Sequence, residues 1–368
     1  MSEKIIIIGG GIAGASAAYH LSKKGIDVTL IDRHDTGQAT DAAAGIICPW
    51  LAQRRNKAWY RLVKMAAKMY PDLIKELETA GETDTGYKQV GALSLHNDEK
   101  KLHATLERVL KRREDAPEIG EIELLDETSA QAKFPLLNEG YQAVFVGGAA
   151  RVDGRKLRDA LIRSAKKNGA KIIEGSAELL VEGTQVRGVQ IDGEKYASNQ
   201  VIATTGAWMN ELLEPFGITG LNVRPQKAQI LHLRYDKLDT ENLPVIKPPG
   251  NQYMLSFEDH RFVVGATVES KAGYDTNVTA AGMHEVLSKA LEVAPDLKDS
   301  AIIEARVGFR PMTNGSLPVI GSLDGLDGLV YANGLGASGL TAGPLMGQQL
   351  AKLAMREETD LNLEDYHL

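Results

Sequence analysis

Residues 4–14 read KIIIIGGGIAG, and this stretch decides how the chain folds. Four consecutive isoleucines predict a buried β-strand, and the glycines after them predict a tight turn into a helix. Gly9 permits the turn, Gly11 lets the backbone approach a pyrophosphate, and Gly14 lets helix and strand pack closely. A second predicted strand ends in Asp32, whose carboxylate can accept hydrogen bonds from a ribose. A glycine turn with a purely structural role is the alternative, but strand, helix and acid together favour a dinucleotide site.

The composition is that of a globular enzyme and excludes several other classes of protein. The 368 residues are 43% apolar and 25% charged, so the chain can bury a large core and two domains are expected. A net charge of −7 argues against a nucleic-acid partner. One cysteine, Cys48, forms no internal disulfide, and no apolar run reaches the length of a membrane span. We therefore expect a cytoplasmic protein.

The pattern along the chain predicts two interleaved domains. Helices are expected at 58–80, interrupted near Pro71, and at 99–113, 154–168, 280–294 and 343–355. Period-two alternation at 226–233 and 261–268 predicts antiparallel strands. The expected fold is α/β, with a Rossmann-like domain interleaved with an α+β domain built on an antiparallel sheet. The first takes residues 1–85, 143–220 and 305–368, and the second takes 86–142 and 221–304.

Four separated motifs carry a family resemblance. They are the glycine-rich start, the Ala42–Gly45 loop, the segment ATTGAW at 203–208, and GFRPMT at 308–313 followed by PVIG at 318–321. In this order they resemble the flavin-dependent D-amino-acid oxidase superfamily, with glycine oxidase, sarcosine oxidase and the D-amino-acid dehydrogenase small-subunit type as the nearest groups. The resemblance covers nearly the whole chain and implies FAD, buried and extended between both domains.

The resemblance also implies which residues bind FAD. The first helix turn, Ile12 and Ala13 included, would hold the pyrophosphate, while Arg33 would lie near the adenine end beside Asp32. A loop of small residues would let the backbone contact the isoalloxazine, although a packed helix start is the alternative. Two further segments would line the cofactor. The residues concerned are Gly9, Gly11, Ile12, Ala13, Gly14, Asp32 and Arg33; Ala43, Ala44, Gly45 and Ile46; and Glu178, Thr205 and Gly206.

The C-terminal glycine cluster has a physical reason to face the flavin. A loop ending before a helix presents backbone N–H groups and a positive dipole end, which would stabilise the negative charge of reduced flavin. A flexible loop is the alternative, and Ser338 and Thr341 could equally be helix N-caps. The residues expected there are Gly334, Gly336, Ala337, Ser338, Gly339, Leu340 and Thr341.

Arg310 and Tyr253 are the residues expected at the substrate. Arg310 lies between an apolar segment and Pro311, so its guanidinium can be fixed to bind a carboxylate through two hydrogen bonds. Tyr253 matches a tyrosine that in glycine oxidase lies on the substrate side, with a buried core tyrosine as the alternative.

Several residues depart from the family pattern. Ala337 stands where glycine oxidase carries a basic residue. Trp50 over the pocket, with Arg54 or Arg55 at its mouth, would favour a substrate larger or more anionic than glycine, although a solvated basic face is the stronger interpretation. Cys48 is expected to be a small buried hydrophobe. The segment around Arg310 holds no cysteine, so FAD is expected to be bound non-covalently.

The resemblance implies oxidation of the C–N bond of glycine, sarcosine, a D-amino acid or a related small amine. A hydride would pass to flavin N5, the imine would hydrolyse to an oxo acid, and oxygen or another acceptor would reoxidise the flavin. A FAD-dependent 2-hydroxy-acid dehydrogenase and a flavoprotein whose FAD is structural or regulatory are the alternatives. An NAD-only enzyme is disfavoured by the C-terminal glycine loop. The sequence leaves open the substrate, the electron acceptor and assembly into a homo-oligomer.

Overall fold

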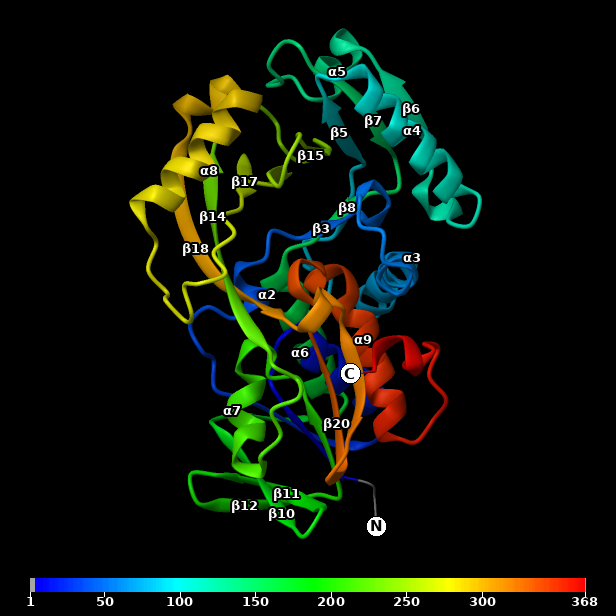
Figure 1. The fold of residues 1–368 in the computed structure, drawn as a ribbon, viewed down its shortest axis with the longest axis vertical. Helices are drawn as coiled ribbons and strands as arrows, with labels where there is room; N and C mark the ends of the chain where they lie inside the picture. The colour runs from blue at the N-terminus through cyan, green and yellow to red at the C-terminus, as the bar shows by residue number, and fades with distance from the viewer. Residues whose placement is uncertain (1–3, 368) are drawn as a thin grey trace.

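Two large β-sheets form the framework of the molecule, whose computed structural model describes residues 4–367 (Figure 1). In this part of the chain the first sheet has nine strands and a parallel core in the order β20-β13-β1-β2-β9. Its strands are β1 (Lys4–Ile8), β2 (Asp27–Asp32), β9 (Lys171–Glu174), β10 (Ala177–Glu182), β11 (Gln185–Ile191), β12 (Glu194–Ala197), β13 (Gln200–Ala203), β19 (Val319–Leu323) and β20 (Leu326–Asn333). The α/β fold class is therefore confirmed.

The second sheet is mainly antiparallel and has eight strands within the described residues. Their order is β18-β14-β17-β16-β15-β5-β7-β6, with only β15 and β5 parallel. The strands are β5 (Ala92–His96), β6 (Ile122–Leu125), β7 (Gln142–Val146), β14 (Arg224–Arg234), β15 (Val245–Lys247), β16 (Tyr253–Phe257), β17 (Arg261–Gly265) and β18 (Ala301–Met312). Three short strands, β3 (Ile46–Ile47), β8 (Ala150–Arg151) and β4 (Lys88–Gln89), form a small sheet. In Figure 1 the long strands β14 and β18 run from the upper part of the molecule toward its centre.

The helices pack around these sheets. They are α1 (Ile12–Lys23), α2 (Ala39–Ala42), α3 (Lys57–Thr79), α4 (Glu99–Arg113), α5 (Glu127–Lys133), α6 (Gly154–Lys167), α7 (Met209–Leu213), α8 (Ala280–Val293) and α9 (Gly339–Ala354). Helix α1 packs against both α6 and α9. Among residues 4–367, no helix is both long enough and apolar enough to cross a bilayer.

The glycine turn after β1 has the close packing that the sequence predicts. Ile5, Ile6 and Ile7 are fully buried because both faces of β1 are covered: Ile5 and Ile7 pack in one hydrophobic cluster with residues of α1 and α9, and Ile6 packs in another. A Cβ atom on Gly14 would lie 1.8 Å from the Gly9 carbonyl oxygen. Only glycine fits there, since no side chain can share that space with backbone.

Two glycines on α9 bring that helix against α1. A Cβ on Gly343 would lie 2.5 Å from Ile12, and one on Gly347 would lie 2.3 Å from the Ala13 carbonyl oxygen. These glycines are four residues apart, so they share one face of α9. The N-terminal halves of both helices are consequently held side by side.

Two prolines lie inside helices, where the sequence predicts an interruption near Pro71 and a later start for the last helix. Helix α3 runs without a break through Pro71, because a proline removes only one backbone donor and packing can offset that loss. Helix α9 begins at Gly339, four residues before the predicted start, and contains Pro344. Pro344 has no N–H to donate to the Leu340 carbonyl, and the buried hydroxyl of Tyr70 donates to it instead.

The expected division into domains falls close to the division between the two large sheets. The expected boundaries after residues 142 and 304 lie inside β7 and β18, which both belong to the eight-stranded sheet. We therefore propose that the second domain extends to the ends of these strands, at Val146 and Met312.

Substitution Tyr70→Phe should lower the free energy of unfolding by about 1–3 kcal/mol, because it leaves the buried Leu340 carbonyl without a donor. Tyr366→Phe is the matched control, since Tyr366 is also buried and donates to the Ala58 carbonyl at 2.8 Å. That carbonyl lies inside α3, where a helical N–H can still reach it, so the control should lose less. Chemical denaturation of both variants measures the difference, and equal losses would contradict this role of Tyr70.

Candidate active site

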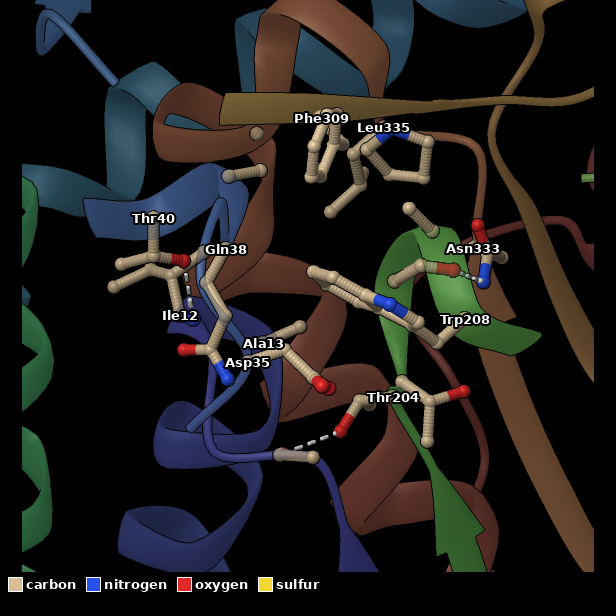
Figure 2. Close-up of a pocket in the computed structure, with 18 of the residues that line it drawn as sticks. Ile12, Ala13, Asp35, Gln38, Thr40, Thr204, Trp208, Phe309, Asn333 and Leu335 are labelled. Atoms are coloured by element: carbon tan, nitrogen blue, oxygen red, sulfur yellow. Dashed lines mark hydrogen bonds between the residues drawn. The ribbon is translucent and has the colours of Figure 1, made fainter. Parts of the chain in front are cut away.

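A long cavity of about 550 Å³ lies where the two large sheets meet. Its floor is formed by the carboxyl ends of β1, β2, β13 and β20, and its far wall by residues of β14, β16 and β18. Crevices at the carboxyl ends of parallel strands are where α/β proteins bind their ligands. Figure 2 shows three of these side chains around the same space: Thr204 after β13, Phe309 on β18 and Asn333 at the end of β20.

The N-terminus of α1 forms part of the cavity wall. Of the residues predicted to bind the pyrophosphate, Gly9, Gly11, Ile12 and Ala13 all line the cavity. Gly11 is the N-cap residue and offers no side chain, while the Ile12 N–H donates to Thr40 Oγ1 at 3.0 Å (Figure 2). The first N–H groups of a helix lack partners within it, so this end is suited to an anionic group.

Asp32 and Arg33, the residues predicted at the ribose and the adenine end, both line the cavity. The buried Asp32 carboxylate accepts hydrogen bonds from the backbone N–H groups of Gly10 and His34 and from Gln38 Nε2, the last at 2.8 Å. These bonds hold the carboxylate at the end of β2. Arg33 pairs with Asp35 at 2.5 Å and with Glu211 at 2.8 Å, so its charge is already compensated.

The small-residue loop contributes Ala43, Ala44, Gly45 and Ile46 to the cavity lining. Gly45 has φ +99°, and a Cβ there would lie 1.8 Å from the Val152 carbonyl oxygen. The loop can therefore turn only with glycine at this position. Helix α2 ends at Ala42, so these residues follow a helix rather than begin one.

The C-terminal glycine cluster only partly faces the cavity. Gly336, Ala337, Gly339 and Leu340 line it, at the N-terminus of α9. Three other predicted residues do not line the cavity, and each packs within the protein. A Cβ on Gly334 would meet Thr313, Ser338 Oγ accepts a hydrogen bond from Trp59 Nε1 at 3.0 Å, and Thr341 Oγ1 donates to the Ile46 carbonyl at 3.1 Å.

Gly14 is the fourth predicted residue that does not line the cavity. It supports the site by allowing the close packing of α1 on the turn after β1. The predicted Glu178, Thr205 and Gly206 do line the cavity. The Gly206 carbonyl accepts a hydrogen bond from Asn333 Nδ2 at 2.9 Å, which joins the ends of β13 and β20 (Figure 2).

Sequence reasoning missed a group of aromatic side chains at the cavity. Trp208, Tyr274 and Phe309 contact one another, with ring centroids 5.5–6.0 Å apart. Trp208 and Phe309 line the cavity, and the Tyr274 hydroxyl donates to the Ala207 carbonyl at 2.7 Å. The three come from distant segments, so no local spacing reveals the cluster. Thr204 and Asn333 also line the cavity, and their places at the carboxyl ends of strands could have indicated it.

Arg310 on β18 and Tyr253 on β16 both line the cavity. Arg310 is half-buried on β18, and its Nη1 donates to Gln226 Oε1 at 3.3 Å. Burial raises the pKa of Tyr253, and the nearby Arg310 guanidinium partly opposes that rise. Tyr253 is therefore a neutral hydroxyl beside a cation, and the apolar side chains of Ala228 and Ile230 line the same region.

Trp50 and Cys48 do not line the cavity. Trp50 is 2% exposed and belongs to the hydrophobic core with Cys48, which corrects the interpretation of Trp50 as a residue over the pocket. Burial also raises the pKa of the Cys48 thiol to about 11, so it stays protonated. Arg54 donates to the Ser316 carbonyl at 2.6 Å and Arg55 is exposed, and neither lines the cavity.

Comparisons with known proteins agree with this geometry. Residues 4–353 match the family model described as FAD dependent oxidoreductase. The chain belongs to this family. It is 56% identical to the uncharacterized oxidoreductase YurR of Bacillus subtilis, over 99% of this chain and 98% of the relative, and 28% identical to a glycine oxidase of Pseudomonas aeruginosa, over 100% and 98%. The crystal structure of iminodiacetate oxidase from Chelativorans sp. BNC1 superposes with a TM-score of 0.95 at 41% identity, covering 99% of this chain and 98% of that one.

The predicted membership of the D-amino-acid oxidase group is thereby confirmed, and the chain is an FAD-dependent oxidoreductase. The cavity fits the cofactor because it offers a helix N-terminus for the pyrophosphate and Asp32 for a ribose. The only cysteine of the sequence does not line the cavity, in agreement with non-covalent FAD.

Substitution Gly11→Val should give a folded protein that lacks FAD. A Cβ on Gly11 meets nothing nearer than Thr40 Oγ1 at 3.3 Å, so the valine would occupy the cavity rather than clash with the backbone. We expect the absorbance of bound flavin to be lost while the circular dichroism spectrum is kept. Gly220→Val is the control, since nothing lies within 4 Å of a Cβ there, and it should retain FAD. A yellow Gly11→Val protein would refute this placement of the pyrophosphate.

Proposed function

We propose that this protein oxidises the C–N bond of a small amine that carries a carboxylate: glycine, sarcosine, a D-amino acid or a related secondary amine. The observation that carries the proposal is the half-buried Arg310 guanidinium at the cavity. It lies within 4.0 Å of no carboxylate in the described part of the chain. A cation held at a cavity without an internal counter-ion is suited to bind an anionic group of a ligand.

The surroundings of Arg310 support a small substrate. Ala228 and Ile230 provide a compact apolar wall, and the Tyr253 hydroxyl can donate a second hydrogen bond to the same carboxylate. Two fixed partners for one carboxylate would hold the neighbouring carbon in a single orientation.

Bound FAD would supply the oxidising chemistry, since its isoalloxazine accepts a hydride at N5. The protein would orient the α-carbon through Arg310 and leave the amine free to react in its neutral form. Among the described residues that line the cavity there is no histidine, so no imidazole base assists the reaction. The substrate loses a hydride from carbon and a proton from nitrogen, and the resulting imine hydrolyses to an oxo acid. Oxygen or another acceptor would then take the two electrons.

We also propose roles for the residues that face the cofactor. The backbone of Gly11, Ile12 and Ala13 would hold the pyrophosphate, and Asp32 would bind the adenosine ribose. The N-terminus of α9 at Gly339 would stabilise negative charge on the reduced flavin. A cytoplasmic location and assembly into a homo-oligomer stay predictions of the sequence.

The similarity to iminodiacetate oxidase supports adding N-carboxymethyl amines to the candidate substrates. Such a compound is a secondary amine that carries a carboxylate one carbon from nitrogen, as sarcosine does. The same contact with Arg310 would therefore serve both. Oxidation of a 2-hydroxy acid is the weaker alternative, because removal of its hydroxyl proton needs a base.

Anaerobic titration of the purified yellow protein would test the proposal. Glycine, sarcosine, iminodiacetate and D-alanine are added in turn, and bleaching of the flavin absorbance identifies a substrate. Bleaching by one of these amines supports the proposal. Bleaching by lactate alone would favour the 2-hydroxy-acid alternative, and no bleaching by any amine or hydroxy acid would favour a structural FAD. Hydrogen peroxide formed in air would identify oxygen as an acceptor.

Substitution Arg310→Ala should raise KM for the identified substrate by about a hundredfold or more, because a charge-assisted pair of hydrogen bonds is lost. FAD content should stay unchanged, which separates this effect from loss of the cofactor. Arg306→Ala is the control, since Arg306 is on the same strand but is paired with Glu304 at 2.7 Å. An unchanged KM in Arg310→Ala would remove this residue from the substrate site.

Substitution Tyr253→Phe should weaken binding of the substrate carboxylate by about 1.5–3 kcal/mol, the value of one hydrogen bond to a charged group. The change should appear mainly in KM, because the ring and its packing are kept. Steady-state kinetics measure it. If KM and kcat both match those of the unaltered enzyme, Tyr253 is a core residue without contact to the substrate.

A further inference from the structure

Arg310 differs from other arginines of this region in having a neutral partner. Arg306, four residues earlier on β18, pairs with Glu304, and Arg261 on β17 pairs with Asp153 at 3.1 Å. Arg310 instead donates to the side-chain amide oxygen of Gln226. Its guanidinium is therefore held in place while its positive charge stays uncompensated.

The amide of Gln226 is itself held from both sides. Gln226 on β14 lies directly opposite Arg310 on β18 in the antiparallel ladder, so both side chains lie on the same face. Its Nε2 donates to Ser270 Oγ at 3.0 Å. Because the NH₂ group is used by Ser270, the oxygen is directed to Arg310. Ser270 is in turn positioned by Glu269, whose backbone pairs with that of Lys227.

A neutral amide at this position has a specific consequence. A glutamate has nearly the same shape but carries a charge, and it would form an ion pair with Arg310. That internal carboxylate would compete with the carboxylate of a substrate. The amide accepts one N–H and leaves the other guanidinium donors for a ligand, since a guanidinium has five.

We propose that Gln226 is a positioning and specificity-determining residue: it orients the Arg310 guanidinium without neutralising it, and so selects substrates that carry a carboxylate. This inference rests on the proposed function. Gln226 acts through Arg310, so it is not a catalytic residue.

The test compares Gln226→Glu with the unaltered holoenzyme, using the amine that bleaches its flavin. We expect KM to rise about tenfold to a hundredfold with kcat changed less than about threefold, because the substitution affects binding of the carboxylate. Acetate is the second probe. Acetate carries a carboxylate but no amine, so it can bind without being oxidised. Its Kd, measured from the perturbation of flavin absorbance, should rise by a similar factor. Gln142→Glu on β7 adds the same charge at an exposed position outside the cavity lining and should change neither value.

Ser270→Ala provides a second variant, at an exposed position where folding is not endangered. Without Ser270 the amide can turn its NH₂ group toward Arg310, so KM and the Kd for acetate should both rise about twofold to fivefold. The inference is overturned if Gln226→Glu retains FAD and both values stay within twofold of the unaltered enzyme. If Gln226→Glu does not retain FAD, unchanged values in Ser270→Ala overturn it. Absence of any oxidisable amine for the unaltered enzyme would instead refute the proposed function.

Discussion

The close contact between α1 and α9 is the constraint on which the rest of the structure depends. Gly343 and Gly347 let the two helices approach at backbone distance, and Gly14 does the same between α1 and the turn after β1. Both helix N-termini are thereby brought to the cavity, although they lie more than 300 residues apart in the chain. A larger residue at any of the three positions would separate the parts that an extended, doubly charged cofactor must touch together.

The fold was largely predictable because its signals are local. The isoleucines of β1, the glycine turn and the helix at Glu99–Arg113 each follow from a short stretch of local sequence. The starting point of α9 was not predictable, because the Tyr70 hydroxyl that compensates for Pro344 comes from a distant helix. For the same reason Pro71 appeared to interrupt a helix that tertiary packing keeps intact.

Residues of the candidate site were predictable where they lie in a sequence motif. They were not predictable where only the tertiary structure brings them to the cavity. Gly11, Asp32 and Arg310 lie in recognisable segments, and each lines the cavity. The cluster of Trp208, Tyr274 and Phe309 forms from three separate stretches, and Trp50 is buried although its neighbours in sequence suggested a pocket residue. Burial depends on which elements meet, and spacing along the chain does not contain that information.

Strands β14 and β18 contribute residues to a different part of the cavity from the elements suited to hold the cofactor. They carry Gln226 and Arg310, whereas the groups suited to hold the cofactor come from β1, β2 and the two buried helices. Under the roles proposed for Arg310 and Gln226, alterations at this wall would change the choice of substrate, while the cofactor site would keep its environment. Such separation gives this scaffold an evolutionary freedom that a site with shared residues would lack, and it marks the β14–β18 ladder as the place to begin engineering.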